Sequence, residues 1–123
     1  MLHMNDIRAA NKREKSAKYG NRKTDVDGIT FDSEREAARY AELRLMERAG
    51  EISGLERQVP FELIPAQLLT NGSTERSVVY VADFSYWQDG HFVVEDAKGH
   101  RTPEYIIKRK LMKRIHDIEI VEV

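Results

Sequence analysis

The sequence predicts one α/β (α+β) domain with a mixed central sheet flanked by helices, in the order helix, three strands, helix, strand (αβββαβ). Two segments, residues 33–50 and 102–116, have the capping residues and composition of helices. Between them lie segments rich in β-branched and aromatic residues, separated by turn residues. The chain of 123 residues is long enough for one hydrophobic core but not for two.

The N-terminal segment is strongly basic and poor in large apolar side chains. Between Arg8 and Lys23 there are seven cations and a single acid, Glu14. We therefore expect residues 1–24 to form a basic, flexible arm and residues 25–123 to form the folded core. The core is expected to begin with a turn at Asp27-Gly28 and a short extended piece at residues 29–31.

The first helix has clear start and stop signals. Ser33 is a suitable N-cap and Glu36 stands three residues later, which is the capping-box pattern, while Gly50 is a typical C-terminal stop. The next segment, GLERQVPFELIP, predicts a strand that is interrupted or bent at Pro60. Residues 66–75, which include Asn-Gly-Ser, are expected to form a loop.

A hairpin and a second helix follow. Residues 78–87 and 92–94 have strand composition, and Asp89-Gly90 between them is the signal of a tight hairpin turn. Thr102 and Pro103 predict the start of a helix that runs to about His116. The final IEIVEV has the alternating pattern of a strand.

Composition excludes several classes of protein. The absence of cysteine excludes disulfides and thiolate zinc sites and is consistent with a reducing compartment. We expect a cytoplasmic protein with no membrane association, because no apolar run reaches bilayer length and the N-terminus lacks a signal-peptide pattern. A second basic cluster at residues 101–114, together with the basic arm, favours nucleic acid as a partner.

The most informative polar residues are Asp83, Asp96 and Lys98. Alternate residues of a strand share a face, so Asp96 and Lys98 point the same way, and the hairpin brings Asp83 near them. Carboxylate oxygens are ligands that Mg²⁺ prefers, and a lysine beside them suits metal-assisted phosphodiester cleavage. The alternative is structural, with an ordinary Asp96–Lys98 ion pair and Asp83 as a turn-capping acid. Glu36 is either half of a capping box or a helix-borne acid of the same site.

The segments FDSEREAARYAELRLMERAGEISGLERQVPFELIP and YVADFSYWQDGHFVVEDAKGHRTPEYIIKRKLMK resemble the PD-(D/E)XK, or restriction-endonuclease-like, nuclease superfamily. More narrowly, they resemble a small phage and prophage family of uncharacterised nuclease-like proteins. The resemblance implies a restriction-endonuclease-like core and a Mg²⁺- or Mn²⁺-dependent DNA endonuclease. It implies that Lys98 is the catalytic lysine. It also implies that a metal ion is bound by the side chains of Asp83, Asp96 and Glu36 and by the backbone carbonyl of Ala97. The chain has Ala82 where the superfamily name has proline, and strand alternation favours Asp96 over Glu95 as the motif acid.

The resemblance also implies partners. DNA contacts are expected from the second basic cluster and from the arm, at His100, Arg101, Lys108, Lys110, Lys113, Lys12, Arg13 and Lys15. A homodimer would allow both strands to be cut. The resemblance to phage nucleases implies branched or junction DNA as the substrate and phage replication or packaging proteins as partners. The protein would be encoded by a phage or prophage and would act in the cytoplasm of the host cell.

Three other functions fit the same residues. The chain could be a catalytically inactive nuclease-fold module that binds DNA or docks to a protein. It could act on RNA. It could also be a structural phage protein in which the carboxylates form an ion-pair cluster without metal. Gln58, on the first strand, is either close to the site or a structural glutamine.

Overall fold

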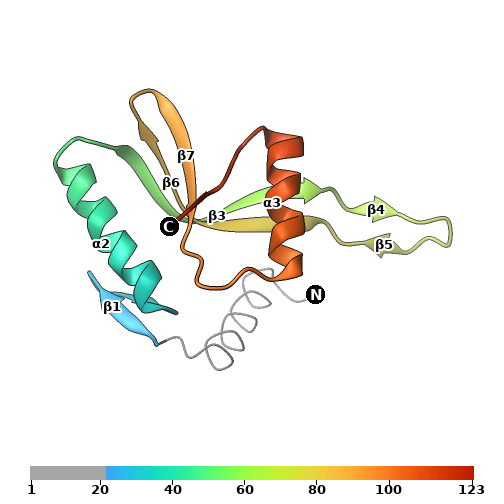
Figure 1. Ribbon diagram of the computed structural model, residues 1–123. Coiled ribbons are helices and arrows are strands. Elements are labelled where there is room, and N and C mark those ends of the chain that lie inside the picture. Colours follow the sequence, from blue (N-terminus) through green and yellow to red (C-terminus); the bar gives the residue numbers. More distant parts are fainter. Residues whose placement is uncertain (1–21) are drawn as a thin grey trace. The chain divides into compact units, whose positions relative to one another are not determined.

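The computed structural model describes residues 22–123 (Figure 1). The elements in chain order are β1 (Thr24–Val26), β2 (Ile29–Phe31), α2 (Glu34–Arg48), β3 (Ser53–Ile64), β4 (Gln67–Leu68), β5 (Thr74–Glu75), β6 (Val78–Gln88), β7 (His91–Asp96), α3 (Pro103–His116) and β8 (Val121–Glu122). Residues 22–123 divide into two compact units, which meet in the chain between Leu45 and Met46. The predicted α+β class with a mixed central sheet is confirmed.

In the first unit, β1 and β2 form an antiparallel hairpin that leads into α2. Its turn residues Asp27 and Gly28 both have positive φ, as the Asp-Gly signal predicts. The backbone N–H of Glu36 donates to Ser33 Oγ at 3.1 Å, so the predicted N-cap of α2 is confirmed. Phe31 packs against Tyr40 of α2, with ring centroids 5.1 Å apart.

The second unit contains a four-stranded sheet in the order β3-β6-β7-β8. β3, β6 and β7 pair antiparallel, whereas β8 pairs parallel to β7. A parallel pair needs a crossover connection, and α3 supplies it between β7 and β8. The predicted succession of strands, helix and final strand is therefore found, although only two residues of IEIVEV pair as β8.

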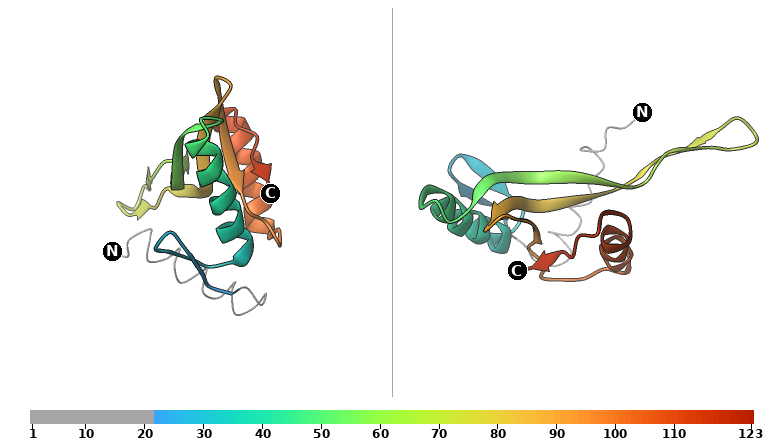
Figure 2. Two further views of the ribbon diagram at one scale, coloured as in Figure 1. Left: turned by 90° about the vertical axis from the view of Figure 1, so that its left-hand side faces the viewer. Right: turned by 90° about the horizontal axis from the view of Figure 1, so that it is seen from above.

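One prediction about the first strands was wrong and another holds only in part. β3 continues through Pro60, which pairs with Val81; a proline is tolerated there because β3 is the edge strand of the sheet. The backbone distortion lies instead at Gln58, whose φ is +55°. The loop predicted at residues 66–75 is found only in part: Gln67–Leu68 and Thr74–Glu75 pair as β4 and β5, and residues 69–73 form the turn between them, in a ribbon that extends away from the sheet (Figures 1 and 2). Asn71 closes this ribbon by accepting a hydrogen bond from the backbone of Ser73 at 3.0 Å.

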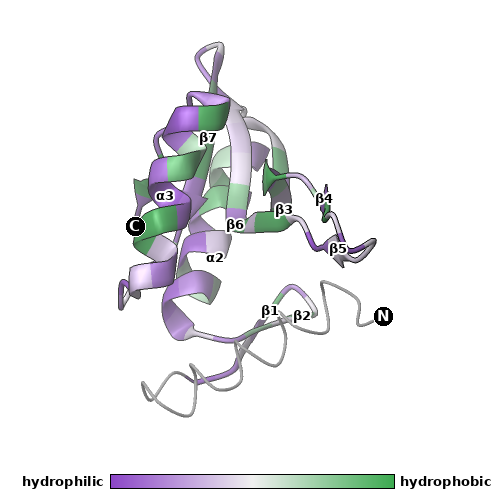
Figure 3. Cartoon of the chain, turned by 90° about the vertical axis from the view of Figure 1, so that its right-hand side faces the viewer, coloured by the Kyte–Doolittle hydropathy of each residue, from purple (hydrophilic) through white to green (hydrophobic). Residues whose placement is uncertain are grey.

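α3 covers one part of the sheet and completes the core of the second unit. Hydrophobic and hydrophilic residues alternate along this helix, as the green and purple segments of Figure 3 show. Thr102 caps its start by accepting from the backbone N–H of Tyr105 at 3.1 Å, and Asp117 ends it in the left-handed conformation. The buried core cluster consists of Leu63, Tyr80, Ala82, Val94, Tyr105 and Met112. Neither helix in residues 22–123 is long and apolar enough to cross a membrane.

Candidate active site

The hairpin of β6 and β7 places Asp83 and Asp96 opposite each other. Its turn is Asp89-Gly90, with φ of +51° and +79°, and the register runs from Gln88↔His91 to Phe84↔Glu95. One further step in this register brings Asp83 across from Asp96. Both side chains are buried, with 5% and 3% of their surface exposed. Two buried carboxylates on neighbouring strands are costly unless their charge is compensated.

Each carboxylate is held by identified donors. Asp83 Oδ2 accepts a hydrogen bond from the backbone N–H of Ala97 at 3.0 Å. Asp96 Oδ2 accepts from the hydroxyl of Tyr80 at 2.8 Å and lies 3.1 Å from Lys98 Nζ. The segment that carries Asp96 and Lys98 is fixed by backbone bonds to Val123, at 3.0 and 3.2 Å. The structure therefore brings Asp83, Asp96 and Lys98 together, as the sequence predicts.

The surroundings of Asp96 disfavour its ionised form. Burial is the largest cause, the hydrogen bond and charge of Asp83 add to it, and together they raise the pKa of Asp96 to about 8. Lys98 and Tyr80 act in the opposite direction. Burial, followed by the charge of Asp96, also raises the pKa of Tyr80, so its hydroxyl stays a donor. The acid pair thus retains a proton at neutral pH.

Glu95 lies beside Asp96 in the chain but has a different environment. Its side chain is fully buried, and its Oε2 accepts a hydrogen bond from the hydroxyl of Tyr86. Asp96, by contrast, contacts Tyr80 and Lys98. This separation follows the alternation of a strand, on which Asp96 was preferred as the motif acid.

Two further candidates are Glu36 and Gln58. Glu36 lies in the first turn of α2, in the first unit, and its side chain is buried. Its backbone N–H bonds to the cap, while its role as a metal ligand stays a prediction. Gln58 lies between the pairs Arg57↔Phe84 and Val59↔Ala82, at the register position across from Asp83. Its left-handed backbone is uncommon for a residue with a side chain, and such strain concentrates at functional sites.

Two of the three α3 lysines that we expected to contact DNA are engaged with acids. Lys108 Nζ lies 3.2 Å from Glu104, and Lys113 Nζ lies 2.8 Å from Asp117 and 3.6 Å from Glu119. Lys113 therefore has more negative than positive charge around it. A DNA phosphate would have to compete with these carboxylates for both lysines.

The remaining predicted DNA contacts differ in position. Lys110 and His100 are exposed, and Arg101 is exposed and paired with Glu122. Lys12, Arg13 and Lys15 lie outside the residues that the structure describes. The DNA-binding roles of all these residues stay predictions.

Sequence reasoning missed two tyrosines of the site. Tyr80 orients Asp96, and the ring of Tyr105 lies under Lys98, with Nζ 4.2 Å from its centroid. A cation over an aromatic face is attracted by its negative charge density, so this ring helps to position the ammonium group. Neither tyrosine could be assigned to the site from the sequence, because a strand or helix pattern does not reveal where a hydroxyl points.

The acid pair offers carboxylate oxygens, which are the ligands that a hard divalent cation prefers. Within residues 22–123 no group of three or more His, Asp or Glu side chains gathers as metal ligands. Mg²⁺, however, commonly keeps several waters and uses only one or two protein carboxylates together with substrate phosphate. Asp83 and Asp96 supply two carboxylates of that kind, while the role of the Ala97 carbonyl as a ligand stays a prediction. The residues present therefore fit a hard cation that is only partly ligated by protein.

Comparison with known proteins gives one match. Residues 16–121 match a family described as "Protein of unknown function (DUF1064)". No curated protein and no solved structure matches the chain.

Proposed function

We propose that this chain, which belongs to the DUF1064 family, is a Mg²⁺- or Mn²⁺-dependent DNA endonuclease with a restriction-endonuclease-like core. The observation that carries the proposal is the buried pair of Asp83 and Asp96, with Lys98 3.1 Å from Asp96. Burying two carboxylates side by side is unfavourable, and a divalent cation between them would remove the cost. The resemblance in sequence assigns the same residues to the same chemistry.

A bound divalent cation would supply an activated water and neutralise charge that develops on the phosphate. Asp83 and Asp96 would hold it, with the carbonyl of Ala97; for Glu36, the role of a further ligand is implied by the resemblance in sequence alone. Tyr80 and the N–H of Ala97 keep the two aspartates oriented before any ligand arrives. Such preorganisation reduces the rearrangement that catalysis would otherwise require.

Lys98 is proposed to act on the attacking water and on the phosphate. Hydrolysis joins water oxygen to phosphorus, breaks the bond to the leaving oxygen and returns a proton to it. An ammonium group at this place donates hydrogen bonds to the water or to a phosphate oxygen. Lys98 Nζ lies 3.1 Å from Asp96, and a cation held by Asp96 would weaken this attraction and leave the ammonium group available to the substrate.

The substrate class and partners follow from the resemblance to phage nucleases. We propose branched or junction DNA as the substrate, with a homodimer that cuts two strands. Phage replication or packaging proteins are the proposed partners. The basic arm, and the basic residues that follow β7, would contact the DNA backbone.

The test uses wild type, Asp83→Asn, Asp96→Asn and Lys98→Ala with linear, nicked, single-stranded and four-way-junction DNA and with RNA. Mg²⁺- or Mn²⁺-dependent cutting by wild type, lost in EDTA and in all three variants, is expected. Asp89→Asn is the matched control, because it removes the same charge at the hairpin turn, where asparagine tolerates a left-handed backbone. If wild type binds DNA but cuts nothing, an inactive DNA-binding module takes the place of the nuclease.

A further inference from the structure

A second charged cluster lies beside the candidate active site and is organised around Glu122. Its Oε1 is 2.9 Å from Arg101 Nε and 2.8 Å from Arg101 Nη2. Its Oε2 accepts from the Tyr105 hydroxyl at 2.7 Å and from Arg109 Nη1 at 3.1 Å. One carboxylate on β8 thus fixes two guanidinium groups, one before α3 and one on it.

The arrangement leaves the cations on the outside. The Glu122 side chain is 19% exposed, whereas those of Arg109 and Arg101 are 35% and 53% exposed. Hydrogen bonds from Arg101 first, and then from Tyr105 and Arg109, hold the pKa of Glu122 down at about 2, so it stays ionised. Two positive charges then face one negative charge. Because a guanidinium has five N–H donors, most donors of both arginines remain for a ligand.

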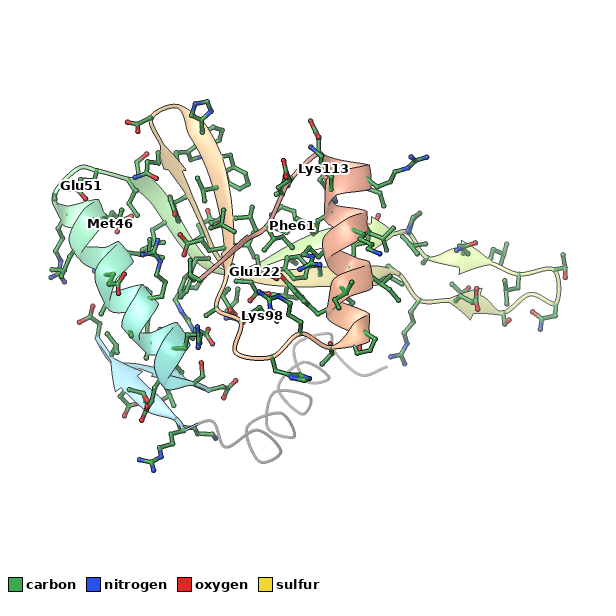
Figure 4. All side chains as sticks on the ribbon, viewed as in Figure 1. Met46, Glu51, Phe61, Lys98, Lys113 and Glu122 are labelled. Carbon is green, nitrogen blue, oxygen red and sulfur yellow. The ribbon has the colours of Figure 1, made fainter. Side chains whose placement is uncertain are left out.

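This cluster is close to Lys98 and Asp96. The ring of Tyr105 contacts Lys98 on its face, while its hydroxyl bonds to Glu122. Asp96 and Glu122 are direct partners in the β7–β8 register. Figure 4 labels Lys98 and Glu122 at this junction of strand ends and α3. A nucleic-acid strand with one phosphate at Lys98 would bring a neighbouring phosphate to the arginines.

We propose that Arg101 and Arg109 form a second phosphate-binding site, which receives a DNA phosphodiester next to the one that is cut. The inference rests on the proposed nuclease function and deepens it by locating the path of the substrate strand. Planar guanidinium groups bind phosphate oxygens in pairs, and a prepositioned fork loses little side-chain entropy on binding. Lys108 and Lys113 are weaker candidates, because carboxylates of their own surroundings oppose them.

The experiment measures affinity for labelled duplex and four-way-junction DNA in EDTA, over a range of salt concentration. Arg101→Gln and Arg109→Gln are each expected to weaken binding about tenfold. Each should also reduce the slope of log K against log salt by about 0.9, the value for one lost phosphate contact. Arg76→Gln removes the same charge from an exposed arginine between β5 and β6, to which no role in binding is assigned, and should change neither quantity appreciably.

A measurement on wild type avoids variants that fail to fold. The arginine Nε–Hε signals, assigned by NMR, are followed while inorganic phosphate and then a short DNA are added. Shifts of the Arg101 and Arg109 signals support the site; unchanged Arg101 and Arg109 signals while DNA is bound overturn it. Arginine variants that lose stability but keep the wild-type salt slope also overturn it, since the cluster would then only dock β8 to α3.

Cleavage is scored separately. Phosphate binding at the arginines without metal-dependent cutting would support the site and refute the nuclease. Metal-dependent cutting by wild type, together with a DNA affinity that is unchanged in Arg101→Gln and Arg109→Gln, would refute the second phosphate site but not the nuclease.

Discussion

The proposed Mg²⁺ site predicts an affinity for Mg²⁺ that depends on pH in a calculable way. A cation would bind the ionised pair, so the proton that Asp96 holds at pH values below its pKa of about 8 would have to leave first. With that pKa, only about 1% of the molecules are ionised at pH 6 and about 90% at pH 9. The apparent Kd should therefore fall about 90-fold from pH 6 to pH 9, equal to about 2.7 kcal/mol, and should level off above pH 8.

Calorimetry measures this directly. Titration with Mg²⁺ at pH 7 in buffers of different ionisation enthalpy should report the release of about 0.9 proton per ion. Asp96→Asn and Asp83→Asn should abolish the binding, whereas Asp89→Asn should leave both Kd and proton release unchanged. A Kd that is flat between pH 6 and pH 8, or binding that survives in Asp96→Asn, would refute the reasoning.

The same proton predicts how stability changes without metal. The pKa of Asp96 lies near 3.8 in the unfolded chain and about 8 in the folded one, so the folded state holds an extra proton between these values. The free energy of unfolding in EDTA should fall as pH rises through this window. Mg²⁺ should restore it above pH 8, where the pair is ionised.

Three further substitutions test individual parts of the structure. Tyr80→Phe removes a hydrogen-bond donor to buried Asp96, so it should lower the free energy of unfolding by about 1–3 kcal/mol in urea titrations. It should also weaken Mg²⁺ binding at pH 7, because the lost hydrogen bond lowers the pKa of Asp96 in the wild type. Gln58→Gly should be more stable than Gln58→Ala by about 1 kcal/mol in the same assay, since glycine accepts a φ of +55° without strain. Thr102→Ala should cost about 1 kcal/mol through loss of the cap of α3, and equal stability would contradict that role.

Local signals in the sequence predicted the helices and the hairpin well. Ser33, Thr102 and Asp89-Gly90 act on residues a few positions away, so their effect is readable without the fold. The β4–β5 ribbon escaped prediction because its strands are two residues long and exposed, and no periodic pattern marks them. Pro60 was misread because its effect depends on whether β3 is an edge strand, which is a property of the whole sheet.

The same limit applied to the candidate site: residues close in the sequence could be associated, and distant ones could not. Alternation and a tight turn were enough to associate Asp83, Asp96 and Lys98, because all three belong to one hairpin and its continuation. Glu122 and Arg109 were not selected, since their meeting depends on the parallel return of β8 after α3. Contacts between residues close in the sequence are specified by short motifs; contacts made by a crossover require the topology.

The acid pair lies where the pairing of β7 changes from one neighbour to the other. The β6–β7 ladder is paired from Gln88↔His91 to Phe84↔Glu95, and β7 pairs with β8 at Glu95 and Asp96. At this point the side chain of Asp83 takes the N–H of Ala97, so a carboxylate does what a strand carbonyl does elsewhere. Inserting one residue in the turn would shift the β6–β7 register by one position. Asp96 would then point to the opposite face, and the buried Glu95 would lie across from Asp83. The length of the turn therefore determines which acid belongs to the site, and a single inserted residue should abolish metal binding even where the hairpin still forms.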